Sequence, residues 1–183
     1  MIPFFGPLPL LLPGMVLSVL ICLAAGGRVA RWLGVATAVA WMFVLDLGAI
    51  LTGTLSPKLT ALDGAVGSGA CDLSRIGPPS LADLVKFYDA VPNVLMFIPL
   101  GVVIAMMPRS RRKAVVLAGA VALPFAIETV QLLVPRLDRA CQSADVADNL
   151  IGLAVGLGAG ALMVRLLPSA SRRGETGTAL GPP

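Results

Sequence analysis

The sequence predicts an all-α integral membrane protein, a helical bundle of about five transmembrane helices with an interfacial helix in the first outer loop. Composition is the first reason, because 57% of the 183 residues are hydrophobic, only 13% are charged, and the mean hydropathy is +0.90. Soluble domains average roughly 45–50% apolar and 25% charged residues. The second reason is that five stretches with few or no charges approach the length of a bilayer-spanning helix, which is about 20 residues. Both observations argue against a water-soluble enzyme.

The first stretch has its core at residues 14–26, and the expected helix starts earlier, near Leu8. The first basic residue, Arg28, follows it, so we expect a retained helix that enters from the outside rather than a secretory signal. The other four stretches are residues 32–54, 92–107, 114–134 and about 145–167. Prolines lie inside the third and the fourth, and Pro99 is expected to bend its helix.

Basic residues predict the orientation. Nine of the 14 Lys and Arg residues lie between the first and second stretches, between the third and fourth, or at and after the end of the fifth. These three places share one side of the membrane only if the chain crosses five times, and the positive-inside rule assigns that side to the cytoplasm. We therefore expect a multi-pass protein of the bacterial plasma membrane with an outer N-terminus and a cytoplasmic C-terminus. The same rule accounts for the net charge of +4, so no nucleic-acid partner is expected.

The long outer connection, residues 58–91, contains the pattern of a short amphipathic helix. Residues 80–83 read Ser-Leu-Ala-Asp, which is a capping-box pattern, and apolar positions spaced by three and four follow. We expect residues 80–88 to lie on the outer membrane surface. Residues 169–183 are small and polar with Gly and Pro, as in a disordered cytoplasmic tail. Residues 1–168 are then a single transmembrane domain.

Cysteine placement allows one disulfide and no metal site. In this topology Cys71 and Cys141 lie in the two outer loops, where an oxidising exterior permits them to pair; the alternative is two free thiols. Cys22 lies within the first helix and is expected to be inert packing. Histidine is absent, and three widely spaced cysteines cannot form a tetrahedral thiolate site. The chain also lacks a P-loop and a dinucleotide motif, so we expect no metal and no cofactor.

Polar residues of the apolar stretches gather toward the outer leaflet, where such side chains are candidates for function by default. They are Asn93, Glu128, Gln131, Asp145, Asp148 and Asn149. Glu128 and Gln131 share one face at i, i+3, and the last three share a face at i, i+3, i+4. One cavity could receive them all. Glu128 is the strongest candidate, because it lies more than a turn from either end of its stretch.

Several of these residues also have a structural interpretation. Asp145 and Asp148 could match the charge of a helix N-terminus, where carboxylates are favoured, and Asn93 could cap a helix start. Capping and binding explain Asp148 and Asn93 equally well. Asp46 lies nearer the middle of its stretch and could pair elsewhere.

A further group of residues is expected to shape the helix packing. A GxxxGxxxG series in the fifth stretch, which ends at Gly160, lets a neighbouring backbone approach closely. The residues with expected structural roles are Phe97, Pro99, Gly101, Gly152 and Gly156.

Three motifs resemble the VanZ-like family of small bacterial membrane proteins, which is associated with resistance to glycopeptide antibiotics such as teicoplanin. They are Asn93-Val-Leu-Met-Phe97-Ile-Pro99-Leu-Gly101, similar to N-x-x-x-F-x-P-x-G, then Glu128-Thr-Val-Gln131, and Asp145-Val-Ala-Asp148-Asn149-Leu-Ile-Gly152, similar to D-x-x-x-N-x-x-G. The resemblance covers residues 89–156. It implies that an Arg of the second outer loop belongs to the site, and both Arg136 and Arg139 fit this role. The family's His near the first helix is missing here.

These residues leave three functions open. The first is a module that binds membrane lipid or a lipid-linked cell-wall component at the outer leaflet and thereby limits antibiotic access; Arg139 would meet an anionic group and the amide side chains would fix polar groups. The second is a membrane-embedded enzyme in which Glu128 and Asp145 act as acid and base on a lipid headgroup. The third, a small transporter, has the least support, because the polar residues concentrate at one end.

Overall fold

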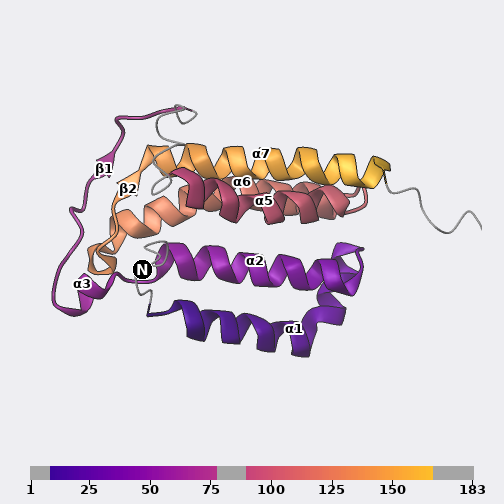
Figure 1. Ribbon diagram of the computed structural model, residues 1–183, viewed down its shortest axis with the longest axis horizontal. Coiled ribbons are helices and arrows are strands. Elements are labelled where there is room, and N and C mark those ends of the chain that lie inside the picture. Colours follow the sequence, from indigo (N-terminus) through magenta and orange to yellow (C-terminus); the bar gives the residue numbers. More distant parts are fainter. Residues whose placement is uncertain (1–8, 78–89, 167–183) are drawn as a thin grey trace, which may run out of the picture.

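The computed structural model of the protein describes residues 9–77 and 90–166, and nearly all of its regular structure is helical (Figure 1). The long helices are α1 Leu11–Leu33, α2 Thr37–Leu55, α5 Ala90–Met106, α6 Arg111–Leu133 and α7 Ser143–Leu166. The short elements are α3 Leu59–Leu62, β1 Cys71–Asp72, η2 Pro135–Leu137 and β2 Cys141–Gln142. The expected interfacial helix at 80–88 and the expected tail at 169–183 lie outside the described residues.

Helix length confirms an all-α membrane bundle. Within the described ranges, α1, α2, α6 and α7 are long and apolar enough to cross a bilayer. The fifth long helix, α5, has 17 residues, which is the lower end of the spanning length. It lies alongside α7 and α6 in Figure 1, so it runs through the same layer as the longer helices.

The helices form two groups, the pair α1–α2 and the group α5–α6–α7 (Figure 1). Glycines bring α5 and α7 together. A Cβ on Gly152 would collide with the Val94 carbonyl oxygen, and a Cβ on Gly156 would collide with that of Ile98. Gly101 faces the α7 backbone in the same way. The backbones therefore touch along the glycine series, as small residues permit between membrane helices.

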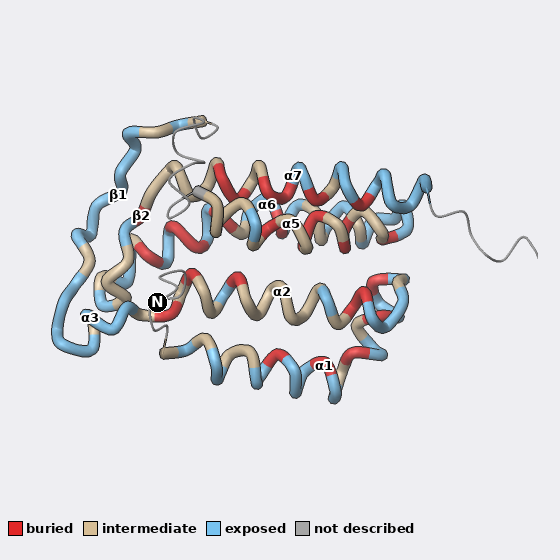
Figure 2. Tube along the Cα trace, viewed as in Figure 1, coloured by how far each residue is buried: buried red, intermediate tan, exposed pale blue. Residues whose placement is uncertain are grey.

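One buried apolar cluster joins the two groups. Its members are Ile50 of α2, Phe97, Leu100 and Ile104 of α5, Ala120 and Ile127 of α6, and Leu153 of α7. Figure 2 shows that buried residues face the inside of the bundle while much of the outer helix surface is exposed. Large exposed side chains such as Leu12 and Leu162 are apolar, which suits contact with lipid tails.

The first two helices meet at a different residue from the one that hydropathy indicates. Trp32 belongs to the end of α1, so placing it at the start of the second helix was wrong. Gly34 adopts a left-handed conformation with φ 71° and ends α1, a conformation that glycine enters without steric cost. Hydropathy missed the last turns of α1 because Arg28 and Arg31 are charged, although long basic side chains can reach from a helix end to the membrane surface.

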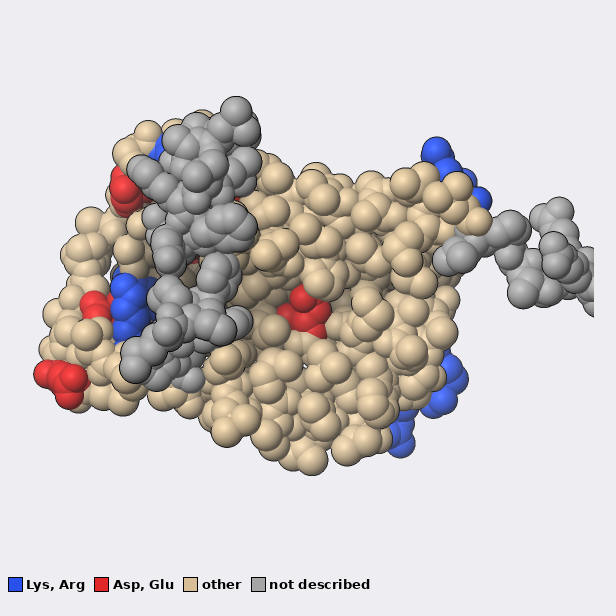
Figure 3. Space-filling view, viewed as in Figure 1, with Lys and Arg blue, Asp and Glu red and all other residues tan. Residues whose placement is uncertain are grey.

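The two ends of the bundle differ in charge. We call the end with the α1–α2 and α5–α6 turns the basic end, and the end with α3, β1, η2 and β2 the loop end. The described cations of the basic end are Arg28, Arg31, Arg109, Arg111, Arg112, Lys113 and Arg165. No described acidic residue lies at that end, whereas the loop end carries both signs (Figure 3). This is the one-sided distribution expected from the sequence.

Candidate functional site

A layer of polar side chains lies one helical turn from the apolar cluster, toward the loop end. Each member is four residues from a buried apolar residue on the same helix, a spacing that puts the two on one face. The pairs are Ile50 and Thr54, Phe97 and Asn93, Ile127 and Gln131, and Leu153 and Asn149. We call Thr54, Asn93, Gln131 and Asn149, together with the neighbouring Glu128, the polar layer. Four helices thus contribute to one level of the bundle.

Two amides of the polar layer are almost fully buried. Gln131 is 6% exposed and donates from Nε2 to the Thr54 carbonyl oxygen at 2.9 Å, while Asn149 is 1% exposed. Gln131 Oε1 and Asn149 Oδ1 are both buried without a hydrogen-bond partner in the described chain. A buried acceptor without a donor costs about 1–3 kcal/mol, so such atoms are rare and require an explanation.

Glu128 is the carboxylate of the polar layer and is 6% exposed. Its Oε2 accepts a hydrogen bond from the backbone N–H of Gln142 at 2.6 Å. No described Lys or Arg forms a salt bridge with it. Arg139, one of the two arginines that the family resemblance suggested for the site, is bonded elsewhere. Glu128 therefore has a backbone donor but no cation beside it in the described residues.

Arg139 secures the end of α2. Its Nε donates to the Ser56 carbonyl oxygen and its Nη2 to the Gly53 carbonyl oxygen, both at 3.0 Å. A cation is favoured there because the last carbonyls of a helix carry partial negative charge. Burial lowers the pKa of the Arg139 guanidinium, while the Asp145 and Asp138 carboxylates act in the opposite direction. Arg136 is exposed, so Arg139 is the arginine of this loop that reaches the bundle.

Asp148 has a partner that the sequence did not reveal. Arg75 donates from Nη1 to Oδ1 at 3.0 Å and from Nη2 to Oδ2 at 2.5 Å. The Asp148 side chain is fully buried, whereas that of Arg75 is 27% exposed. A bidentate pair of this kind is strong and directional. The one available signal was the position of Arg75, four residues after a cysteine predicted to be tethered.

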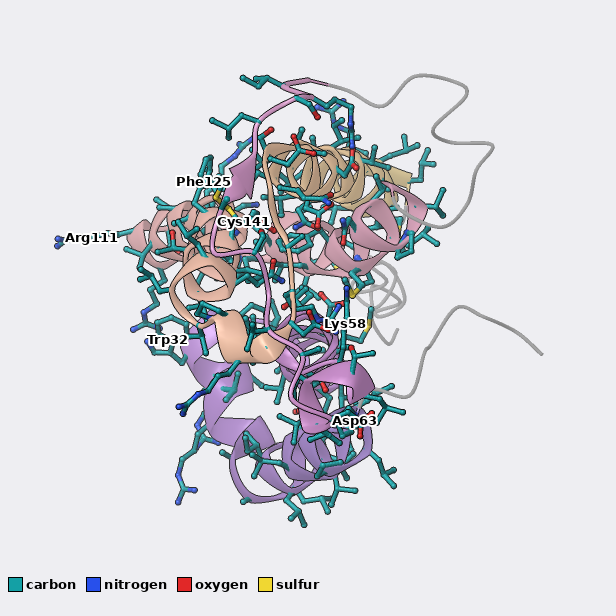
Figure 4. All side chains as sticks on the ribbon, turned by 90° about the vertical axis from the view of Figure 1, so that its left-hand side faces the viewer. Trp32, Lys58, Asp63, Arg111, Phe125 and Cys141 are labelled. Carbon is teal, nitrogen blue, oxygen red and sulfur yellow. A yellow bond between two sulfur atoms is a disulfide. The ribbon has the colours of Figure 1, made fainter. Side chains whose placement is uncertain are left out.

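The predicted disulfide between Cys71 and Cys141 is confirmed, with Cα atoms 4.5 Å apart. The same residues start two short parallel strands, in which Cys71 pairs with Cys141 and Asp72 with Gln142. Ser143 Oγ then donates to the Arg75 carbonyl oxygen at 2.8 Å. Figure 4 looks onto the loop end and shows the disulfide beside the Cys141 label. These bonds hold the first outer loop against the start of α7.

The remaining acidic candidates lie at different depths. Asp145 is in the first turn of α7, half-buried, and its charge acts on both Glu128 and Arg139. Asp46 is also half-buried, with Oδ2 unpartnered among the described residues, but it lies eight residues before Thr54. That is about two turns farther into the bundle. Asp145 therefore borders the polar layer and Asp46 does not belong to it.

The arrangement brings together most of the residues that the sequence singled out. Asn93, Gln131 and Asn149 lie in one layer with Glu128, and Asp145, Asp148 and Arg139 lie at its loop-end side. No group of His, Cys, Asp or Glu in the described residues has the geometry of a metal site. Carboxylate and amide oxygens beneath a braced loop can bind a polar group that enters from the loop end.

Comparison with known proteins agrees with the motifs. No curated protein and no solved structure gives a significant match to this chain. A family model described as VanZ/LLP1 matches residues 52–164, which is more than half of the chain. The matched segment runs from the end of α2 through α7 and includes the whole polar layer. The chain therefore belongs to the VanZ/LLP1 family of membrane proteins.

Proposed function

We propose that this protein acts at the outer leaflet of the bacterial plasma membrane on a polar, membrane-proximal or lipid-linked component of the cell envelope, and thereby confers tolerance to glycopeptide antibiotics such as teicoplanin. The observation that carries the proposal is the polar layer at the end of membrane-spanning helices. It holds a buried carboxylate and two amide oxygens that have no hydrogen-bond partner among the described residues. Polar groups at such a depth cost free energy, so they commonly mark function.

The charge distribution supports the outer-leaflet assignment. The positive-inside rule puts the basic end in the cytoplasm, which leaves the loop end and the polar layer outside. A disulfide at the loop end suits an oxidising exterior. A ligand that approaches from the outer leaflet then meets Asn93, Gln131 and Asn149, with Glu128 supplying charge. Two nitrogen atoms of the Arg139 guanidinium already bond to α2, so Arg139 can bind a ligand only with its remaining N–H donors.

A membrane-embedded enzyme is the second candidate, and the proximity of Asp145 to Glu128 favours it. Glu128 is 6% exposed with one backbone donor, whereas Asp145 is half-buried and interacts with the Arg139 charge. Two carboxylates in different surroundings are the arrangement that allows one to act as acid and the other as base. The substrate would be a lipid headgroup.

The test is antibiotic tolerance in a teicoplanin-susceptible host that expresses the full chain. Wild type is expected to raise the inhibitory concentration of teicoplanin. Glu128→Gln keeps an acceptor for the Gln142 N–H, so we expect it to accumulate normally in the membrane while tolerance is lost, and we expect the same of Asp145→Asn. Thr129→Val is the matched control, because the Thr129 hydroxyl is exposed and bonds to its own helix at the Phe125 carbonyl oxygen.

Three results would contradict the proposal. Wild-type protein that reaches the membrane without raising tolerance would remove the glycopeptide function. Tolerance that falls only in step with the amount of folded protein would assign Glu128 and Asp145 a structural role. Retained tolerance in both variants would exclude these carboxylates from the mechanism.

A further inference from the structure

We infer that the polar layer binds a primary ammonium group, held by Glu128, Gln131 and Asn149. The inference rests on the proposed function, since it names the ligand chemistry of the same site. It concerns binding alone and is tested without reference to antibiotic tolerance.

The buried atoms of the layer that lack a partner among the described residues are acceptors. The bond from Gln131 Nε2 to the Thr54 carbonyl fixes the orientation of that amide, so its free atom is the oxygen Oε1. Asn149 Oδ1 is the second free acceptor. Glu128 adds a carboxylate that receives one backbone N–H and lacks a cation among the described residues. A ligand that satisfies the layer must therefore supply hydrogen-bond donors and positive charge.

These acceptors come from facing helices at one level. Gln131 lies three residues after Glu128, on the same face of α6. Asn149 lies one turn from Leu153 of α7, and Leu153 packs in the same apolar cluster as Ile127, the residue before Glu128. The N–H of Gln142, just before α7, bonds to Glu128 directly and so ties α6 to the start of α7 at this level.

The nearby cations are already engaged by the scaffold. Arg75 forms its bidentate pair with Asp148. Arg139 bonds to the carbonyls of Ser56 and Gly53. Neither guanidinium neutralises Glu128. The positive charge that neutralises this carboxylate must therefore come from outside the described residues or from a proton.

A primary ammonium matches this set of groups. It carries three N–H donors and one positive charge, which correspond to two amide oxygens and one carboxylate. A phosphate or carboxylate offers only acceptors and would face like charge. A quaternary ammonium brings the charge but no N–H donor, so it would leave both amide oxygens unpaired. The headgroup of an ethanolamine phospholipid and a soluble primary amine both supply the required chemistry.

The experiment compares two lipids that differ only in that group. The full-length protein is placed in nanodiscs of dioleoylphosphatidylcholine, and increasing fractions of dioleoylphosphatidylethanolamine are added while the thermal unfolding temperature is followed. We expect a saturable rise for wild type. Each hydrogen bond to a charged group that is lost should weaken binding about tenfold or more. The half-saturating fraction should therefore increase at least tenfold in both Asn149→Leu and Glu128→Gln.

Controls separate this binding from general lipid effects. Thr129→Val, with its exposed hydroxyl on the same helix, should respond as wild type does. Ethanolamine added to nanodiscs that contain only phosphatidylcholine tests the soluble source, and a saturable rise there would assign the site to a free amine rather than to a lipid. If Asn149→Leu does not fold, Glu128→Gln alone decides, because it keeps the acceptor for the Gln142 N–H.

Two outcomes would overturn the inference. The first is an absence of any preference for the primary over the quaternary ammonium in folded wild-type protein. The second is a preference that persists unchanged in both variants, because the ammonium would then bind elsewhere. Either outcome leaves the proposed function standing, since tolerance is measured separately.

Discussion

The pair between Arg75 and Asp148 makes a quantitative prediction about stability. Asp148 is fully buried and receives two charge-assisted hydrogen bonds from Arg75, at 3.0 and 2.5 Å. Arg75→Met keeps an unbranched side chain in place of the aliphatic part of Arg75 but leaves the buried carboxylate without its cation. The variant tests whether this contact holds the first outer loop to α7.

The magnitude follows from the burial of each partner. Removing one member of a buried ion pair costs about 3–5 kcal/mol. Because Arg75 is 27% exposed, water screens part of the interaction, so we expect about 3 kcal/mol for Arg75→Met. Asp148→Asn retains an acceptor and leaves a cation that can reach water, and should cost about 1–2 kcal/mol. The double variant Arg75→Met/Asp148→Asn should cost less than the sum of the two single variants, with a coupling of about 2 kcal/mol.

Unfolding by sodium dodecyl sulfate in mixed micelles, followed by circular dichroism, measures these free energies. The four proteins of the double-mutant cycle are compared with the disulfide intact in each. A cost below about 1 kcal/mol for Arg75→Met, or a coupling near zero, would show that the buried Asp148 carboxylate does not depend on Arg75.

Three further predictions concern the scaffold. Cys71→Ser should lower the free energy of unfolding by at most about 4 kcal/mol, the chain-entropy value for a separation of 70 residues, and reductant should then have no further effect. Gly152→Ala should destabilise by about 1–3 kcal/mol in the same assay, because its Cβ meets a carbonyl of α5, whereas Gly158→Ala, with open space around it, should be neutral or stabilising. A reporter active only after export should be silent after Pro183 and active after Gly69; the opposite result would reverse the assigned orientation.

Most of the fold could be predicted because hydropathy and length dominate in a membrane protein. Backbone groups in hydrocarbon must bond within their own segment, so an apolar stretch of sufficient length becomes a helix. The ends of the helices were less predictable, since each depends on a single residue. Gly34 ends α1 after Trp32, and α6 begins at Arg111 because Ser110 accepts the Lys113 N–H as an N-cap, a local bond that no hydropathy window detects.

The polar layer was predictable for a related reason. Glu128 and Gln131 share a face by helical spacing, and Asn149 is one turn from a buried leucine, so local periodicity alone brings them to one level. The partner of Asp148 was not predictable in this way. Arg75 is 73 residues away in sequence, and its position depends on the disulfide and on the strand pairing, both of which are long-range. The contacts of Arg139 were unpredictable for the same reason, because its acceptors are carbonyls of α2, which is distant in sequence.

The two arginines are the reason why we infer a cationic rather than an anionic ligand for the polar layer. If Arg75 or Arg139 faced Glu128, the layer would be neutral and anionic groups could enter beside a guanidinium. Instead Arg75 neutralises Asp148 and Arg139 bonds to the end of α2. Both guanidinium groups are thus engaged elsewhere, and among the described residues the acceptors of the layer stay without a donor. An anion at this level would add negative charge to Glu128 in a medium where such repulsion is only weakly screened. The chemistry of the site therefore depends less on which polar residues are present than on which of them the fold leaves without partners.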